Sequence, residues 1–206
     1  SHDRITFIPT PEELSEVALL HIRRVRQPVV SFGQGCEGEP LLVADTLAAA
    51  IRRIRHKTDR GTIHLNTNGS RPDAVASLLE AGLDSIRLSI NSFQPRLYEA
   101  YFRPRHYALT DVIESGRRVR EAGGFVSVNL LVFPGLSDRS EDIAATIDGL
   151  RACGADFVQM RNLNIDPDIY RSAMDPATSA APGGLTTLMG RILDAIPTIR
   201  FGYFNP

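Results

Sequence analysis

Hydrophobic and polar residues alternate with a period of two along several short segments of this chain. Ile63 and Leu65, for example, alternate with His64 and Asn66. A period of two predicts β-strands with one apolar face and one polar face. The segments predicted as strands, most of which show this alternation, span residues 29–33, 62–67, 85–91, 125–132 and 156–162.

Between these segments the apolar residues recur with helical spacing. A glycine follows three of the expected helices, at Gly82, Gly123 and Gly154, where a left-handed cap suits a residue without a side chain. Residues 165–183 contain three prolines and predict a loop, and residues 198–204 predict a terminal strand. Helices are predicted near 11–26, 43–57, from Pro72 onward, and around 112–119, 143–150 and 184–195.

Strands that alternate with helices predict an α/β fold with a parallel sheet. A parallel sheet covered by helices on both faces would have apolar strands throughout, whereas these strands keep one polar face. We therefore expect residues 1–206 to form a single domain, a partial, open (βα)6-type parallel barrel of TIM-like form, with helices outside. The polar interior indicates that a large ligand binds inside it, because ordinary barrels fill this space with branched apolar side chains.

Composition excludes several classes of protein. The formal net charge is −1, which argues against a nucleic-acid-binding module or a polybasic membrane binder. No apolar run approaches the ~20 residues that span a bilayer. The chain has two cysteines, Cys36 and Cys153, so a disulfide framework is not expected and a reducing, cytoplasmic setting is the simplest interpretation.

Polar residues and glycines follow the predicted strands at the ends where parallel sheets place their binding sites. Glycines in the first of these loops let the backbone come close to a ligand. Each motif by itself is also explained by an ordinary turn, but five in register favour a binding site. The five segments are 33–40, 67–69, 89–92, 133–135 and 161–164.

Four of these segments together resemble the radical S-adenosylmethionine (radical SAM) enzymes. Glu37-Gly38-Glu39-Pro40 is similar to the Gly-Gly-Glu-Pro motif of that family, with Glu37 in place of its first glycine. Thr67-Asn68-Gly69, then Ser89 and Asn91, and finally residues 132–135 follow in the family's order. The resemblance covers residues 29–164, and 165–206 remain as a C-terminal loop, helix and possible strand.

The resemblance implies a role for each matching residue. Glu37, Gly38 and Glu39 would hold the amino group of S-adenosylmethionine, with Thr67 and Asn68 on the next strand. Ser89 and Asn91 would reach the ribose. Arg161, or less favourably Arg87, would bind the carboxylate, because a guanidinium forms a fork with a carboxylate. For Arg87 we favour a salt bridge at the lower end of the barrel.

The family's second cofactor is a [4Fe-4S] cluster held by a Cys-x3-Cys-x2-Cys motif. Cys36 and Cys153 lie 117 residues apart and do not form this motif, so the cluster ligands are not expected in this chain. The resemblance also places the family's first strand before Ser1. We therefore expect an excised part of a radical SAM domain whose first strand is missing, which leaves an open sheet edge beside 29–32 and a possibility of self-association.

The activity implied for the parent protein is reductive cleavage of S-adenosylmethionine to a 5′-deoxyadenosyl radical, which abstracts hydrogen from an unknown substrate under anaerobic conditions. We expect this chain alone to be inactive. Two alternatives remain: a non-catalytic binding or scaffold protein with a degenerate barrel, and an aldolase-like barrel, for which Lys57 is the sole lysine and lies on an outer helix. We further expect Asn68, Ser89 and Asn91 to point into one cavity with Glu39 at its rim.

Overall fold

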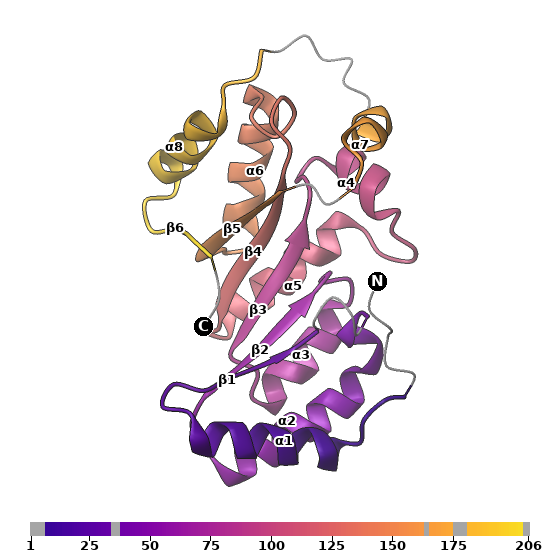
Figure 1. Cartoon of the computed structure of the whole chain (residues 1–206), viewed down its shortest axis with the longest axis vertical. Coiled ribbons are helices and arrows are strands. Elements are labelled where there is room, and N and C mark those ends of the chain that lie inside the picture. Colours follow the sequence, from indigo (N-terminus) through magenta and orange to yellow (C-terminus); the bar gives the residue numbers. More distant parts are fainter. Residues whose placement is uncertain (1–6, 34–37, 163–164, 175–180, 204–206) are drawn as a thin grey trace.

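Six parallel strands form one open sheet in the order β1-β2-β3-β4-β5-β6 (Figure 1). The computed structural model describes residues 7–33, 38–162, 165–174 and 181–203. Neighbours in this sheet are also neighbours in the sequence, as expected when each crossover helix returns the chain to the next parallel strand. The strands are β1 (Val29–Phe32), β2 (Thr62–Thr67), β3 (Ser85–Ile90), β4 (Phe125–Val132), β5 (Phe157–Asn162) and β6 (Arg200–Phe201).

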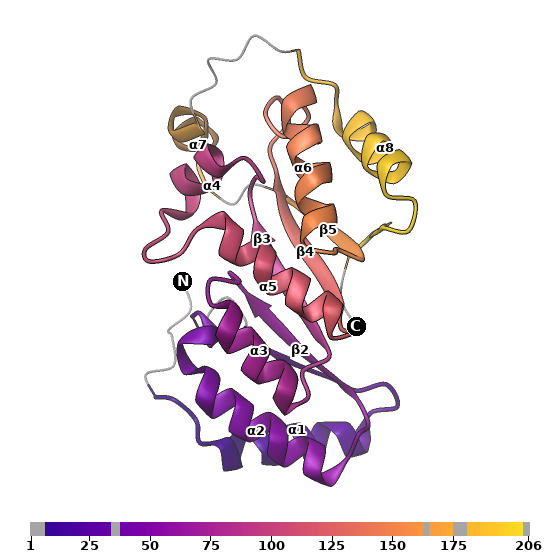
Figure 2. The same ribbon diagram turned by 180° about the vertical axis from the view of Figure 1, so that it is seen from behind.

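The crossover helices lie along one face of this sheet, as Figure 2 shows for α2, α3, α5 and α6. They bury the apolar face of the strands, including Leu65, Ile86 and Val128, which are all fully buried. Within the described part of the chain, no helix is long and apolar enough to cross a membrane. The helical elements are α1 (Pro11–Arg24), η1 (Pro40–Val43), α2 (Ala44–Lys57), α3 (Pro72–Ala81), α4 (Pro95–Phe102), α5 (Leu109–Glu121), α6 (Ser140–Ala152), α7 (Pro167–Met174) and α8 (Leu185–Ala195).

The open parallel architecture confirms the predicted fold class. The sheet does not close, because β1 and β6 are its two edges. Each of the three predicted cap glycines has a positive φ, and the amide of Gly82 donates to the carbonyl groups of Leu78 and Leu79 at the end of α3.

Two helices differ from the prediction. Residues 165–183 were predicted as a loop, but they contain α7. The Asp166 carboxylate accepts hydrogen bonds from the amides of Asp168 and Ile169 and so caps the first turn of this helix. The second is α4, which the pattern did not predict. It packs against α7 at the end of the sheet toward which the strands run, with Tyr101 and Tyr170 edge to face at 5.6 Å (Figure 1).

Candidate functional site

Two of the sequence motifs become one hydrogen-bonded unit at the ends of β1 and β2. The Glu39 carboxylate accepts a hydrogen bond from the Thr67 hydroxyl and another, of 2.8 Å, from the backbone amide of Asn68. A third comes from the amide of Leu41 at 3.0 Å, so that Glu39 also caps η1. The carboxylate is therefore held from both sides, by its own loop and by the next strand.

The approach of these two loops depends on Gly33. Its φ is +79°, a left-handed conformation that favours glycine. A Cβ at this position would lie 2.0 Å from the carbonyl oxygen of Asn66 on β2. Gly33 therefore allows the end of β1 to pack directly against β2, where Glu39 bonds to the Thr67 hydroxyl.

Among the described residues, the Glu39 carboxylate accepts three hydrogen bonds and keeps capacity for one more donor. Of the three bonds, two fall on Oε1 and one on Oε2. A carboxylate offers about four lone-pair sites, so Oε2 has room for an additional N–H. A primary ammonium suits this position, because it adds an opposite charge and a charge-assisted hydrogen bond.

The second part of the site is the polar face of the sheet. Strand register brings its residues side by side: Ser31 is opposite His64 and His64 opposite Ser85, while Asn66 is opposite Arg87. Hydrogen bonds link these neighbours, from Asn66 to Ser31 at 2.8 Å and between His64 and Ser85 at 2.7 Å. The polar interior predicted from the alternation is therefore present, and its groups bond to one another.

His64 is neutral at ordinary pH. It is 1% exposed, and burial together with the nearby positive charge of Arg87 lowers the pKa of its imidazole to about 4. The imidazole therefore adds a hydrogen-bonding group, and no charge, to the interior.

A cavity of about 710 Å³ opens above this polar face. Ser89 and Asn129 line it from neighbouring strands, and Arg161 lines it from β5. The Arg161 guanidinium lies over the Tyr203 ring, 5.6 Å from its centroid, as in a cation–π contact. The other residues of the lining are Ile90, Tyr101, Phe102, Leu131, Met160 and Asn162.

The residues singled out by sequence are only partly brought together. Ser89 and Arg161 share this cavity, but Asn68 and Asn91 are absent from its described lining, so the prediction of one cavity for all of them is wrong. Asn91 is 3% exposed, and its amide donates to the carbonyl of Leu97 in α4 at 3.0 Å. The Asn68 side chain accepts from the amide of Ser70 in a local turn.

Three further expectations concern Arg87, the residues just before Gly38, and Gly38 itself. The salt bridge expected for Arg87 is wrong, because no carboxylate among the described residues pairs with it and its Nη1 donates instead to the neutral Gln159 amide oxygen at 2.9 Å. Glu37 and Cys36 lie outside the described residues. Gly38 has a φ of +89°, which favours glycine, but a Cβ there would meet no atom of the described residues within 4 Å, so no close contact with them requires glycine.

Sequence reasoning did not select Asn129, Gln159 or Tyr203 as site residues. The period-two alternation of 125–132 and 156–162 already placed Asn129 and Gln159 on the polar face, so the signal existed for these two. Tyr203 follows β6, which pairs with β5, and only that pairing brings it to Arg161.

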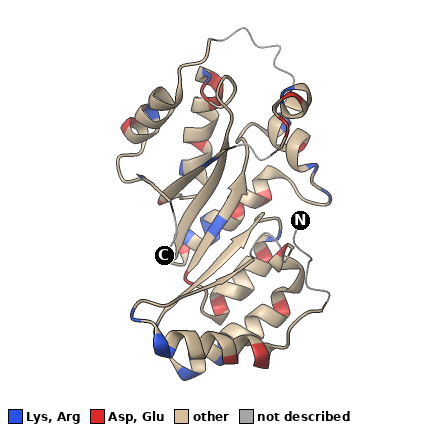
Figure 3. Cartoon of the chain, in the orientation of Figure 1, with Lys and Arg blue, Asp and Glu red and all other residues tan. Residues whose placement is uncertain are grey.

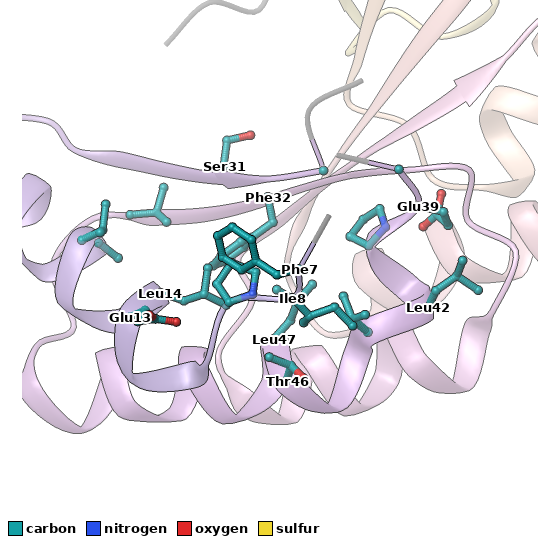
Figure 4. Close-up of a pocket in the computed structure, with 18 of the residues that line it drawn as sticks. Phe7, Ile8, Glu13, Leu14, Ser31, Phe32, Glu39, Leu42, Thr46 and Leu47 are labelled. Carbon is teal, nitrogen blue, oxygen red and sulfur yellow. The ribbon is translucent and has the colours of Figure 1, made fainter. Parts of the chain in front are cut away.

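A second hollow, of about 880 Å³, runs along β1 at the edge of the sheet (Figure 4). Its walls are mostly apolar and include Phe7, Ile8 and Leu42, and Glu39 lies at one end. Leu42 is 71% exposed. Among the described residues, the predicted open edge at 29–32 is confirmed, because there β1 pairs with β2 alone, while β6 pairs with β5 at the opposite edge.

Comparison with known proteins adds family information to this geometry. The family model described as "Radical SAM superfamily" matches residues 3–147. Among curated proteins, the chain is 27% identical over 179 residues to the FeMo cofactor biosynthesis protein NifB of Klebsiella pneumoniae, covering 79% of this chain and 36% of that protein. It is 34% identical over 119 residues to the GTP 3′,8-cyclase of a Nostoc species, covering 52% and 34%.

Solved structures show the same fold. A domain of the pyruvate-formate lyase-activating enzyme from Bacteroides vulgatus superposes with a TM-score of 0.58 at 12% identity, covering 85% of this chain and 99% of that one. The hydrogenase maturase HydG gives a TM-score of 0.62 at 16% identity, covering 98% and 46%. The chain thus spans about a third of the length of the curated relatives that it matches.

Proposed function

The chain belongs to the radical SAM superfamily, and from that premise we propose that the whole protein is an enzyme that generates a radical from S-adenosylmethionine to abstract hydrogen from a substrate. Members of this family use S-adenosylmethionine and a [4Fe-4S] cluster. When bound, these cofactors supply the 5′-deoxyadenosyl radical, and the protein positions them and excludes water. The observation that carries the proposal is the Glu39 carboxylate, held by Thr67 and Asn68 with one acceptor position free.

The donor and acceptor set fits S-adenosylmethionine. Its ammonium suits Oε2 of Glu39, where the carboxylate is already oriented by the Asn68 amide. We propose that Arg161 pairs with its carboxylate and that the Ser89 hydroxyl bonds to its ribose, since both side chains line one cavity. Asn91 would act at a distance from the cofactor, because its amide fixes α4 through Leu97.

The described residues do not fit the cluster. Cys153 is fully buried at the end of α6, and burial raises the pKa of its thiol to about 12, so the thiolate that iron requires is strongly disfavoured. No group of three or more His, Cys, Asp or Glu side chains that could hold a metal occurs among the described residues. We therefore derive no step that involves cluster ligands from this chain.

The proposal is tested by binding and by product analysis. We expect S-adenosylmethionine to bind to the 206-residue chain in calorimetric titration and Glu39→Gln to weaken it about tenfold or more, because a charge-assisted hydrogen bond is lost. Glu80→Gln, on the exposed face of α3, is the matched control and should bind as the unmutated chain does.

With the whole protein, anaerobic incubation with S-adenosylmethionine and a reductant should yield 5′-deoxyadenosine. The Glu39→Gln variant should yield less. Equal binding by Glu39→Gln and the unmutated chain would remove the support that the geometry gives to this proposal.

A further inference from the structure

The described lining of the cavity at the ends of β3–β5 contains one charged side chain, that of Arg161. The six strands contain neither Asp nor Glu, and Figure 3 shows positive charge on them while the acidic side chains lie mainly on helices and loops. Within the described part of the chain, no carboxylate pairs with Arg161 and no acceptor bonds to its guanidinium. Its N–H groups are therefore available to a ligand.

An aromatic ring holds this guanidinium where a carboxylate could have done so. The Cζ atom of Arg161 lies over the ring of Tyr203, 5.6 Å from its centroid, within the distance of about 6 Å at which a cation is attracted to a π face. The ring acts through its quadrupole and adds no formal charge. Arg161 therefore keeps its full charge and its N–H fork for a carboxylate while the ring holds it.

The pairing of β6 with β5 brings the ring to this position. Val158 is opposite Phe201, and the amide of Gly202 donates to the carbonyl of Val158 at 3.3 Å, so the pairing continues past the end of β6. A Cβ at Gly202 would lie 3.0 Å from the ring of Phe157, so a glycine here lets the chain pass close to that ring. Tyr203 follows directly and lines the cavity from the side of β5.

An arginine that is held before its ligand arrives binds that ligand more tightly. Arg161 is exposed, and a long exposed side chain loses rotamer freedom when it forms a hydrogen-bonded pair. Holding the guanidinium in the cavity beforehand reduces this loss on binding. At an exposed site, a cation–π contact corresponds to a factor of about two to five in an equilibrium constant.

We propose that Tyr203 is a positioning residue, whose ring holds the Arg161 guanidinium in the cavity so that its N–H groups can pair with the carboxylate of S-adenosylmethionine. This inference rests on the proposed function, which assigns that carboxylate to Arg161. Tyr203 acts through Arg161 and needs no contact with the cofactor. Both residues follow the stretch that the family model matches, residues 3–147, so the pair adds to the site a part that this match does not cover.

A double-mutant cycle tests whether the ring acts through the arginine, with calorimetric titration of S-adenosylmethionine into the 206-residue chain. Tyr203→Leu should weaken binding about two- to fivefold, and Tyr203→Phe, which keeps the ring, should bind as the unmutated chain does. In the Arg161→Gln background, Tyr203→Leu should have no further effect, because the ring then has no cation to hold. Phe125→Leu is the control, since Phe125 is 36% exposed and does not line the cavity.

Three results of the cycle would overturn the inference. The first is unchanged binding by Tyr203→Leu, and the second is an equal loss with and without the Arg161 guanidinium, which would mean that Tyr203 acts independently. The third is binding by Tyr203→Phe as weak as that by Tyr203→Leu, which would assign the effect to the hydroxyl. Tyr203 is 65% exposed, so we expect these variants to fold as the unmutated chain does.

NMR of the ligand-free chain separates this inference from the proposed function. The ring current of Tyr203 should shift the Arg161 Nε–H resonance, so Tyr203→Leu should move this resonance and Tyr203→Phe should leave it nearly in place. A resonance that Tyr203→Leu does not move would overturn the positioning. If the unmutated chain bound no S-adenosylmethionine while the ring-dependent shift was present, the proposed function would fail and the positioning of Arg161 by Tyr203 would stand.

Discussion

Glu39 and Asn68 are joined by a hydrogen bond of 2.8 Å although 29 residues separate them in the chain. The bond runs from a backbone amide to a carboxylate, so it depends on where the two strands end more than on the identity of the Asn68 side chain. The bond couples the orientation of the Glu39 carboxylate, which is proposed to bind the ammonium, to the packing of β1 against β2. Anything that separates these strand ends should therefore disturb both stability and cofactor binding.

Gly33 offers a direct test of this coupling. We expect Gly33→Ala to lower the free energy of unfolding by about 2–4 kcal/mol, because the new Cβ would meet the Asn66 carbonyl and the left-handed φ would be strained. Gly123→Ala is the matched control. Gly123 has the same φ of +79° but nothing within 4 Å of its Cβ position, so about 1 kcal/mol is expected. Urea unfolding measures both, and equal losses would contradict the close approach at Gly33.

His64 predicts a pH dependence. Its folded-state pKa of about 4 is lower than the ordinary 6.5, so the unfolded chain binds the proton more tightly. The contribution of neutral His64 to the free energy of unfolding is thus fully present above pH 6.5 and is lost as the pH falls from 6.5 through 4. The full loss is about 3 kcal/mol.

We expect the stability of the unmutated chain, relative to His64→Gln, to fall over this range. Glutamine provides the comparison because it cannot be protonated but can still bond to Ser85. Chemical unfolding at several pH values measures the difference, and a constant difference would contradict a buried, neutral His64.

Iron–sulfur reconstitution tests the cysteine chemistry. We expect the 206-residue chain, treated anaerobically with iron and sulfide, to form no stoichiometric four-iron cluster, because the buried Cys153 thiol resists ionisation. Iron and sulfide analysis with optical spectra provides the measurement. Cys153→Ala should give the same result, and a stoichiometric cluster in the unmutated chain that Cys153→Ala abolishes would show that this thiol is a ligand.

The apolar hollow along β1 leads to a prediction about association. An open strand edge beside exposed apolar side chains favours pairing with a second copy. We expect a concentration-dependent dimer in sedimentation velocity experiments and a weaker one in Leu42→Lys, since Leu42 lines the hollow. Leu20→Lys is the control, because Leu20 is 48% exposed on α1 but does not line the hollow. A strictly monomeric chain would contradict this prediction.

Much of the fold follows from local pattern. The period of two in 62–67 and 85–90 determined both the strands and their polar face, because successive side chains of a strand point to opposite sides. Glycines such as Gly82 marked the helix ends, since they take a left-handed conformation at little cost. Glu39 and Thr67 were identified from their motifs, and the structure joins them by a hydrogen bond.

Tertiary structure decided the contacts between residues that lie far apart in the chain. Arg87 bonds to Gln159, 72 residues away, because the order and register of β3, β4 and β5 bring the two side chains together. Asn91 was expected in the cavity but is covered by α4 and α7, two short helices that become stable by packing on each other and on Leu131 and Leu136. Helices this short are marginal in isolation, so no local pattern determines them. The sequence by itself therefore determined which residues share a strand face, and packing alone decided which of them border the cavity.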